Sequence, residues 1–189
     1  MEQVKMLLVV DPQIDFITGT LPVPGAAEAM DALGRYIDEH GATYAVKMVT
    51  ADWHPYNHCS FDRRGGQWPP HCVQHSAGAA LWQPLLESLN KSRGGFTMLY
   101  KGIRVDKDEY SVMENAESAA VLLRLIEALK IDRIDVCGLA GNICVLNTMR
   151  DLVAFFGPKK LRLLTDYAPS LDDGSELKAF VAENGIETL

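Results

Sequence analysis

The sequence predicts an α/β protein with a three-layer, doubly wound and mainly parallel sheet of five or six strands, covered by helices on both faces. Two observations lead to this fold class. Short apolar runs alternate along the chain with amphipathic stretches, which is the pattern of right-handed βαβ crossovers. The runs are also almost continuously apolar, as expected for strands that are buried on both faces of the sheet.

The expected elements follow one another in regular order. The first strand is "KMLLVVD" (5–11). The first helix, 26–40, places Met30, Leu33 and Ile37 on one face, and Gly41 ends it. The further strands are expected at 43–52, 96–101, 133–138 and 160–166, with a short sixth strand at 186–189. The further helices are expected near 78–89 and at 114–130, 143–156 and 173–184.

Length and composition fit a single domain over 1–189, because 48% of the 189 residues are hydrophobic and 23% are charged. A net charge of -7 argues against nucleic acid or an anionic membrane as partner. The sequence contains no signal peptide and no apolar run of transmembrane length, so a cytoplasmic protein with four reduced cysteines is expected. The expected partner is a small molecule, and a homo-oligomer is left open.

Four chemical groups stand at the ends of the expected strands. Asp11, Asp52 and Lys101 end the first three strands, and Cys144 follows the fourth, near the start of a helix. A doubly wound sheet brings these ends to one edge, where ligands bind. There the acid can take the thiol proton, the cation can keep the acid ionised, and the helix start favours a thiolate. The alternative is that Cys144 is a small buried hydrophobe, as most free cysteines are.

The segment 52–77 is too long for an ordinary connection and contains metal-binding side chains. Asp52 and His54 are two residues apart, so on an extended segment they face the same side. With His71 they would form a set of two imidazoles and one carboxylate with positions left open, which suits a divalent metal. Zinc is the first candidate, and iron or manganese are alternatives. A purely structural zinc is the other interpretation, with ligands drawn from His54, His58, Cys59, Cys72 and His75.

These motifs resemble the nicotinamidase (pyrazinamidase) branch of the isochorismatase-like cysteine hydrolase superfamily over essentially the whole chain. The resemblance rests on "LLVVDPQIDF" (7–16), "TADWHPYNHCSF" (50–61), "WPPHCVQ" (68–74), "YKG" (100–102) and "VCGLAGNICV" (136–145). It implies a metal-dependent cysteine amidohydrolase that converts nicotinamide to nicotinate and ammonia through a thioester, in the salvage of pyridine nucleotides.

The resemblance also assigns roles residue by residue. It implies a catalytic triad of Asp11, Lys101 and Cys144, and metal ligation by Asp52, His54 and His71. It implies that Phe16 and Trp68 sandwich the pyridine ring, that Tyr110 lies near the pocket, and that the Leu139–Ala140 peptide is cis. The backbone N–H groups of Ala140 and Cys144 would then form an oxyanion hole.

The chain departs from the family pattern at Gly141–Asn142, where many members have Thr-Asp, and this leaves the role of those two positions open. Whether His58 ligates the metal is also left open. Three rival functions remain at this stage. They are an amidase of the same superfamily acting on an N-carbamoyl or ureido compound, a hydrolase whose metal-bound hydroxide attacks, and a ligand-binding module without turnover.

Overall fold

Six parallel strands form one sheet in the order β3-β2-β1-β4-β5-β6. The protein is seen here as a computed structural model that describes residues 3–189, so residues 1–2 of the expected domain lie outside the described residues. The strands are β1 (Lys5–Val10), β2 (Val46–Asp52), β3 (Thr97–Lys101), β4 (Arg133–Gly138), β5 (Leu161–Leu163) and β6 (Glu187–Thr188). This architecture confirms the predicted fold class.

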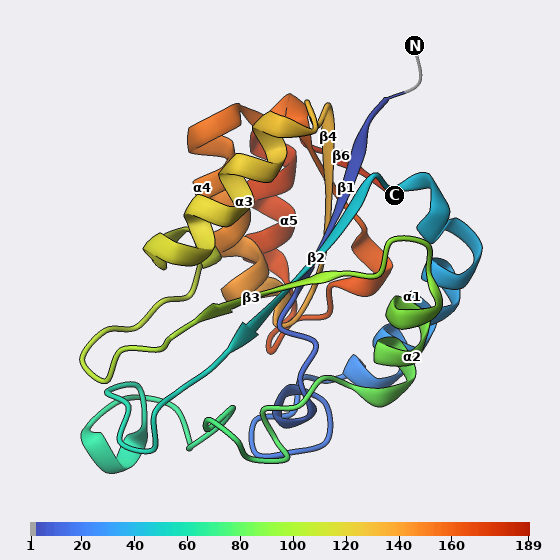
Figure 1. Cartoon of the computed structure of the whole chain (residues 1–189). Coiled ribbons are helices and arrows are strands. Elements are labelled where there is room, and N and C mark those ends of the chain that lie inside the picture. Colours follow the sequence, from blue (N-terminus) through green and yellow to red (C-terminus); the bar gives the residue numbers. More distant parts are fainter. Residues whose placement is uncertain (1–2) are drawn as a thin grey trace.

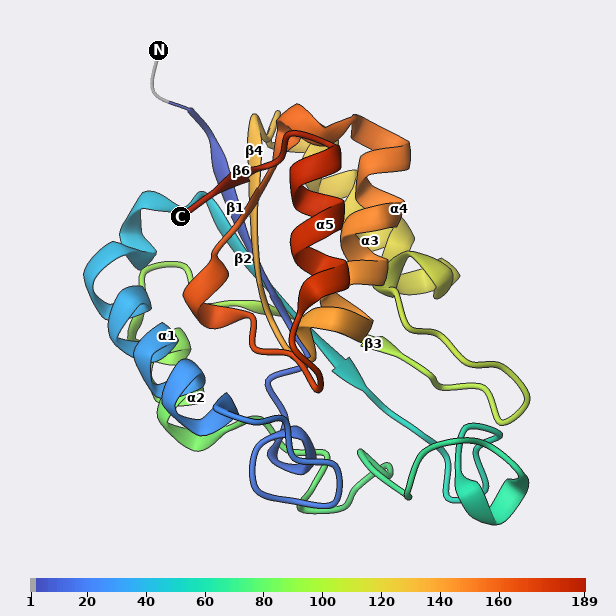
Figure 2. The same cartoon turned by 180° about the vertical axis from the view of Figure 1, so that it is seen from behind.

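Five α-helices within residues 3–189 cover the sheet in two layers. They are α1 (Ala26–His40), α2 (Gln83–Lys91), α3 (Ala116–Ala128), α4 (Leu146–Phe156) and α5 (Ser175–Glu183). Helices α1 and α2 pack together on one face, and α3, α4 and α5 cover the other (Figures 1 and 2). The order of the strands reverses between β1 and β4, and in such sheets the reversal opens a crevice at the carboxyl ends of the strands.

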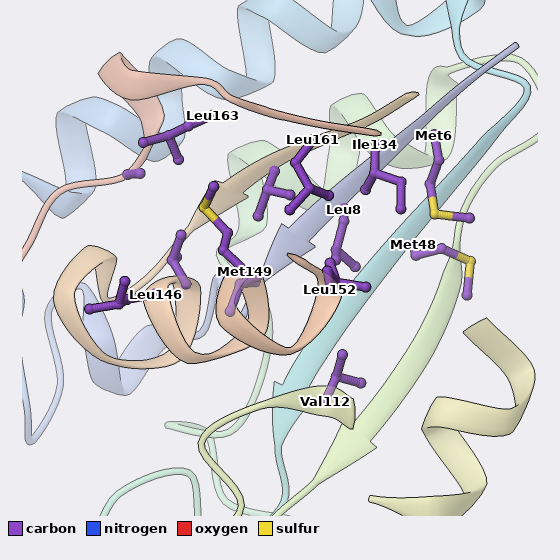
Figure 3. Packing of buried hydrophobic residues seen from close by; sticks show 14 of the residues in the cluster. Met6, Leu8, Met48, Val112, Ile134, Leu146, Met149, Leu152, Leu161 and Leu163 are labelled. Carbon is purple, nitrogen blue, oxygen red and sulfur yellow. The ribbon is translucent and has the colours of Figure 1, made fainter. Parts of the chain in front are cut away.

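The central strand β1 shows why the sequence folds this way. Its side chains alternate between two cores: Met6, Leu8 and Val10 join the cluster under α3 to α5, and Leu7 and Val9 join the cluster under α1 and α2. All five are completely buried. Figure 3 shows Leu8 of β1 in the first cluster, together with Leu146, Met149 and Leu152 of α4.

Two elements differ from the sequence-based expectation. Helix α2 begins at Gln83 and not near 78, because Leu81 pairs with Gln13 and Trp82 N–H donates to the carbonyl of Pro12. These contacts hold the segment extended until Pro84 opens the helix. The expected helix at 143–156 is preceded by a π-helical turn over Gly141–Val145, so Cys144 lies in this turn and not in the first turn of α4.

The segment 52–77 runs along the carboxyl ends of the strands (Figure 1). It is tied together by two bridges, His54 to Val73 and Phe61 to Trp68. No helix among residues 3–189 is long and apolar enough to cross a membrane.

Candidate active site

The strand ends bring Asp11, Lys101 and Cys144 together, as predicted from the sequence. The Nζ atom of Lys101 lies 2.8 Å from Oδ2 of Asp11 and 3.4 Å from Sγ of Cys144. Lys101 and Asp11 have no exposed surface, and Cys144 is 6% exposed. The ammonium, the carboxylate and the thiol are therefore in direct reach of one another, beneath the surface of the protein.

Lys101 makes a third contact that the sequence did not indicate. Its Nζ atom lies 2.6 Å from Oδ1 of Asp52, which stands opposite Lys101 in the ladder between β2 and β3. The three donors of the ammonium thus face Asp11, Asp52 and Cys144. The nucleophile cluster and the predicted metal ligands are consequently one connected network, although they come from different segments of the chain.

Burial and Lys101 have opposing effects on the pKa values of this network. Burial raises the pKa of the Asp11 carboxyl and of the Cys144 thiol above their usual ranges, although the Lys101 ammonium acts against it in both. Burial would also raise the pKa of Asp52, but Lys101 and His54 hold it well below its usual range. The pKa of Lys101, which burial would lower, is raised by Asp11 and Asp52. The expected thiolate at a helix start is thus opposed by burial.

Thr50 is a partner of Asp11 that sequence reasoning missed. Its hydroxyl donates to Oδ1 of Asp11 at 2.6 Å, and the Asp11 N–H donates to the Thr50 carbonyl at 3.1 Å. Thr50 is completely buried and lies two residues before Asp52 on β2. The spacing in the sequence could have indicated that Thr50 belongs to the site, because residues i and i+2 of a strand face the same side.

Asp52, His54 and His71 also come together, with ligand atoms within 4.8 Å of one another. Oδ2 of Asp52 lies 3.5 Å from Nε2 of His54 and 3.9 Å from Nε2 of His71. The Nδ1 atoms point away and contact carbonyls, that of Gly102 at 3.0 Å for His54 and that of Pro69 at 2.8 Å for His71. Such contacts fix the ring orientation and leave Nε2 free to bind a metal. This donor set fits a divalent ion.

His58, a further histidine of this segment, is engaged elsewhere. The ring centroids of His58 and His54 lie 4.2 Å apart, with the planes tilted by 32°. The Nδ1 atom of His58 contacts Oγ of Ser60 at 2.6 Å, and its Nε2 atom contacts the Lys107 carbonyl at 3.0 Å. His58 has donor atoms near those of Cys59 and Asp108, in a group separate from Asp52. Because both ring nitrogens already have partners, His58 is not placed as a ligand beside Asp52.

A pocket opens above the two clusters. Its wall contains the three aromatic side chains expected at the substrate, Phe16, Trp68 and Tyr110. The indole N–H of Trp68 donates to the Tyr110 hydroxyl at 3.1 Å, which joins the segment 52–77 to the segment after β3. Cys144, Ala140, Asp52, His54 and His71 also line the pocket. A small planar ring would therefore meet the thiol and the metal ligands at the same time.

The turn that carries Cys144 is fastened to the segment 168–171. The Leu139–Ala140 peptide is cis, as the resemblance implied. The Gly141 N–H donates to the Pro169 carbonyl at 2.7 Å, and a Cβ on Gly141 would lie 2.4 Å from the Ala168 carbonyl oxygen. Oδ1 of Asn142 accepts from the Leu171 N–H at 2.9 Å. The two unusual residues thus hold this segment close enough for Leu171 to line the pocket.

Asp15 is a further residue that received no role from the sequence, although it lies in the quoted motif "LLVVDPQIDF". Its Oδ2 accepts from the Cys72 N–H at 2.7 Å and its Oδ1 from the Thr20 N–H at 3.1 Å. Cys72 follows His71 directly and has a positive φ of 45°. Asp15 therefore fixes the backbone next to a predicted metal ligand.

Comparison with known proteins gives a consistent result. The isochorismatase domain model matches residues 5–154. The nicotinamidase of Escherichia coli (strain K12) is 32% identical over 180 residues, covering 86% of this chain and 81% of the relative. A solved pyrazinamidase of Pyrococcus horikoshii in complex with zinc has a TM-score of 0.84, 29% identity and 98% coverage of both chains. A solved L. infantum protein in complex with nicotinate has a TM-score of 0.85 and 31% identity, covering 100% of this chain and 93% of that one.

Proposed function

Because the chain belongs to the isochorismatase domain family, we propose that it is an amidohydrolase that converts nicotinamide to nicotinate and ammonia. One observation carries the proposal: a buried thiol, ammonium and carboxylate lie directly beside two imidazoles and a carboxylate, at the base of an aromatic pocket. A binding module has no use for a nucleophile beside a base, and a small N-carbamoyl compound such as N-carbamoylglycine has no ring for the aromatic walls to enclose.

In the proposed reaction, Asp11 accepts the proton of Cys144 and the thiolate attacks the amide carbon. The raised pKa of the Asp11 carboxyl, caused by burial, suits a group that must take a proton and later return it. The N–H groups of Ala140 and Cys144 receive the developing oxyanion, a contribution of about 3 kcal/mol for each donor. Asp11 then protonates the leaving nitrogen, the C–N bond breaks, and ammonia leaves.

The thioester that remains is hydrolysed by water, which forms nicotinate and restores the thiol. Asp11 takes a proton from this water in the same way as from Cys144. Lys101 stays charged throughout and keeps Asp11 oriented toward the sulfur, because its pKa is raised by the carboxylates of Asp11 and Asp52 despite its burial.

Asp52, His54 and His71 hold one divalent metal ion in this proposal, with zinc as the first candidate and iron or manganese as alternatives. When bound, the ion supplies a Lewis acid for the pyridine nitrogen. Phe16 and Trp68 enclose the two faces of the ring, and Tyr110 keeps Trp68 in place through its hydroxyl. These contacts orient the carboxamide toward Cys144.

We also propose a cytoplasmic location for the protein. All four cysteines are free, which supports this proposal because disulfides are rare in the reducing cytoplasm.

The test is ammonia release by the purified chain with nicotinamide, compared with N-carbamoylglycine at equal concentration. We expect kcat/KM for nicotinamide to exceed that for the N-carbamoyl compound by at least about a hundredfold, because only the pyridine ring fills the aromatic pocket. Equal or reversed preference would assign the chain to another amidase of the same family.

A further inference from the structure

Gln13 uses its whole side-chain amide to hold the backbone of Asp52. The Asp52 N–H donates to Oε1 of Gln13 at 2.8 Å, and Nε2 of Gln13 donates to the Asp52 carbonyl at 2.8 Å. A second donation from Nε2 reaches the Ala79 carbonyl at 2.9 Å and fixes the plane of the amide. Gln13 has no exposed surface. None of these contacts reaches the pocket, so Gln13 has no direct part in the proposed chemistry.

These hydrogen bonds between the Gln13 amide and the backbone of Asp52, here called the Gln13 clamp, take the place of a neighbouring strand beside Asp52. Strand β1 ends at Val10, and the last contact of its backbone with β2 is the Asp11 N–H to the Thr50 carbonyl at 3.1 Å. Beyond Pro12 the chain turns away, so Asp52 would keep an unpaired N–H and carbonyl on that side. A buried backbone group without a partner is costly, and the Gln13 amide satisfies both.

Asp52 also connects the two parts of the site. One of its carboxylate oxygens pairs with Lys101 at 2.6 Å, and the other faces His54 and His71. A ligand displaced by about 1 Å can lose much of its contribution to binding, so the backbone that carries it must be fixed. We propose that Gln13 is the positioning residue for Asp52, and that through it the end of β1 sets the geometry and affinity of the metal site. This inference rests on the metal ligands of the proposed function.

The test measures Co²⁺ binding, by competition with a chelating dye and by the visible spectrum of the bound ion, without any substrate. Gln13→Met keeps the length of the side chain and removes all three contacts. Gln13→Glu keeps the acceptor for the Asp52 N–H but sets a carboxylate oxygen against two carbonyls. We expect the Co²⁺ dissociation constant to rise at least tenfold in both variants, and the Co²⁺ spectrum to change because the ligand geometry changes.

Gln74→Met is the matched control, because Nε2 of Gln74 donates to the carbonyl of Trp53 at 2.9 Å, one residue after Asp52. It should bind Co²⁺ within threefold of wild type with the same spectrum. A merely structural role for Gln13 would lower the melting temperature and leave the spectrum and affinity of the folded protein unchanged, and that result in either folded Gln13 variant overturns the proposal. Failure of wild type to bind Co²⁺ would also overturn it, whereas nicotinamide hydrolysis is judged separately by ammonia release.

Discussion

Lys101 occupies the point at which the proposed nucleophile and the proposed metal site meet. Its ammonium contacts Asp11 at 2.8 Å and Asp52 at 2.6 Å, without any exposure to solvent. Lys101→Met keeps the aliphatic stem but leaves two buried carboxylates without their cation, which costs about 3–5 kcal/mol of stability. Because Asp11 also loses its orientation, kcat/KM for nicotinamide should fall at least about a hundredfold at neutral pH.

Lys47 provides the control for this substitution. It is also a buried lysine, 2% exposed, on β2, but its Nζ atom donates to the carbonyls of Gly41 and Arg93. Lys47→Met also removes a buried ammonium, but one that contacts no catalytic group. It should therefore leave kcat/KM within about threefold of wild type. Equal loss of turnover in both variants would show that the effect is general destabilisation and not the chemistry of Lys101.

Cys144 and Cys137 form a second matched pair. Both thiols are buried and lie close in sequence, but only Cys144 lines the pocket. Cys144→Ala should reduce ammonia release to below about a thousandth of wild type while Co²⁺ binding is retained, because the thiol is the proposed nucleophile and not a ligand. Cys137→Ala should keep most of the turnover. Substantial ammonia release by Cys144→Ala would instead favour attack by a metal-bound hydroxide.

Helix α4 packs against the core through one of its faces. Leu152 is completely buried in the core under α3 to α5, whereas Phe155, three residues later, is 62% exposed. Leu152→Ala should lower the free energy of unfolding by about 2–5 kcal/mol through lost burial and the cavity that remains. Phe155→Ala should change it by less than about 0.5 kcal/mol. Denaturant titrations of both variants measure this difference, and equal effects would mean that the helix is packed differently.

The sequence predicts an element well where the pattern of that element's own residues determines its bounds. It does not predict bounds that depend on contacts with residues far away in the chain. The apolar runs of β1 and β4 and the one-sided helix α1 follow from local periodicity. The late start of α2 depends on Pro12 and Gln13, which lie some seventy residues away in sequence. The same holds in the site: the strand-end groups follow from topology, but the Gln13 clamp is a side-chain contact with a distant backbone, which no periodicity shows.

For the whole molecule, the position of the site follows from the connectivity of the sheet. β1 and β4 are adjacent and parallel, and the chain leaves them on opposite sides, so Asp11 and the Cys144 turn face each other across the reversal of strand order. β2 and β3 add Asp52 and Lys101 from the neighbouring strand ends. The chemistry is therefore assembled from four segments that meet only in the folded chain.

Metal binding should consequently stabilise the fold as a whole. Asp52, His54 and His71 are brought together only by folding, so a divalent ion binds the native state in preference to the unfolded chain. At a free zinc concentration one hundred times the dissociation constant, the gain is about 2.7 kcal/mol, which for a chain of this size raises the melting temperature by about 5–11 °C. Melting temperatures measured with zinc and with a chelator test this increase.

His71→Ala should lose most of the increase in melting temperature. His75→Asn should retain it, because this residue of the same segment has a φ of 65°, which asparagine tolerates. An equal increase in wild type and His71→Ala would place the ion elsewhere and remove His71 from the ligand set.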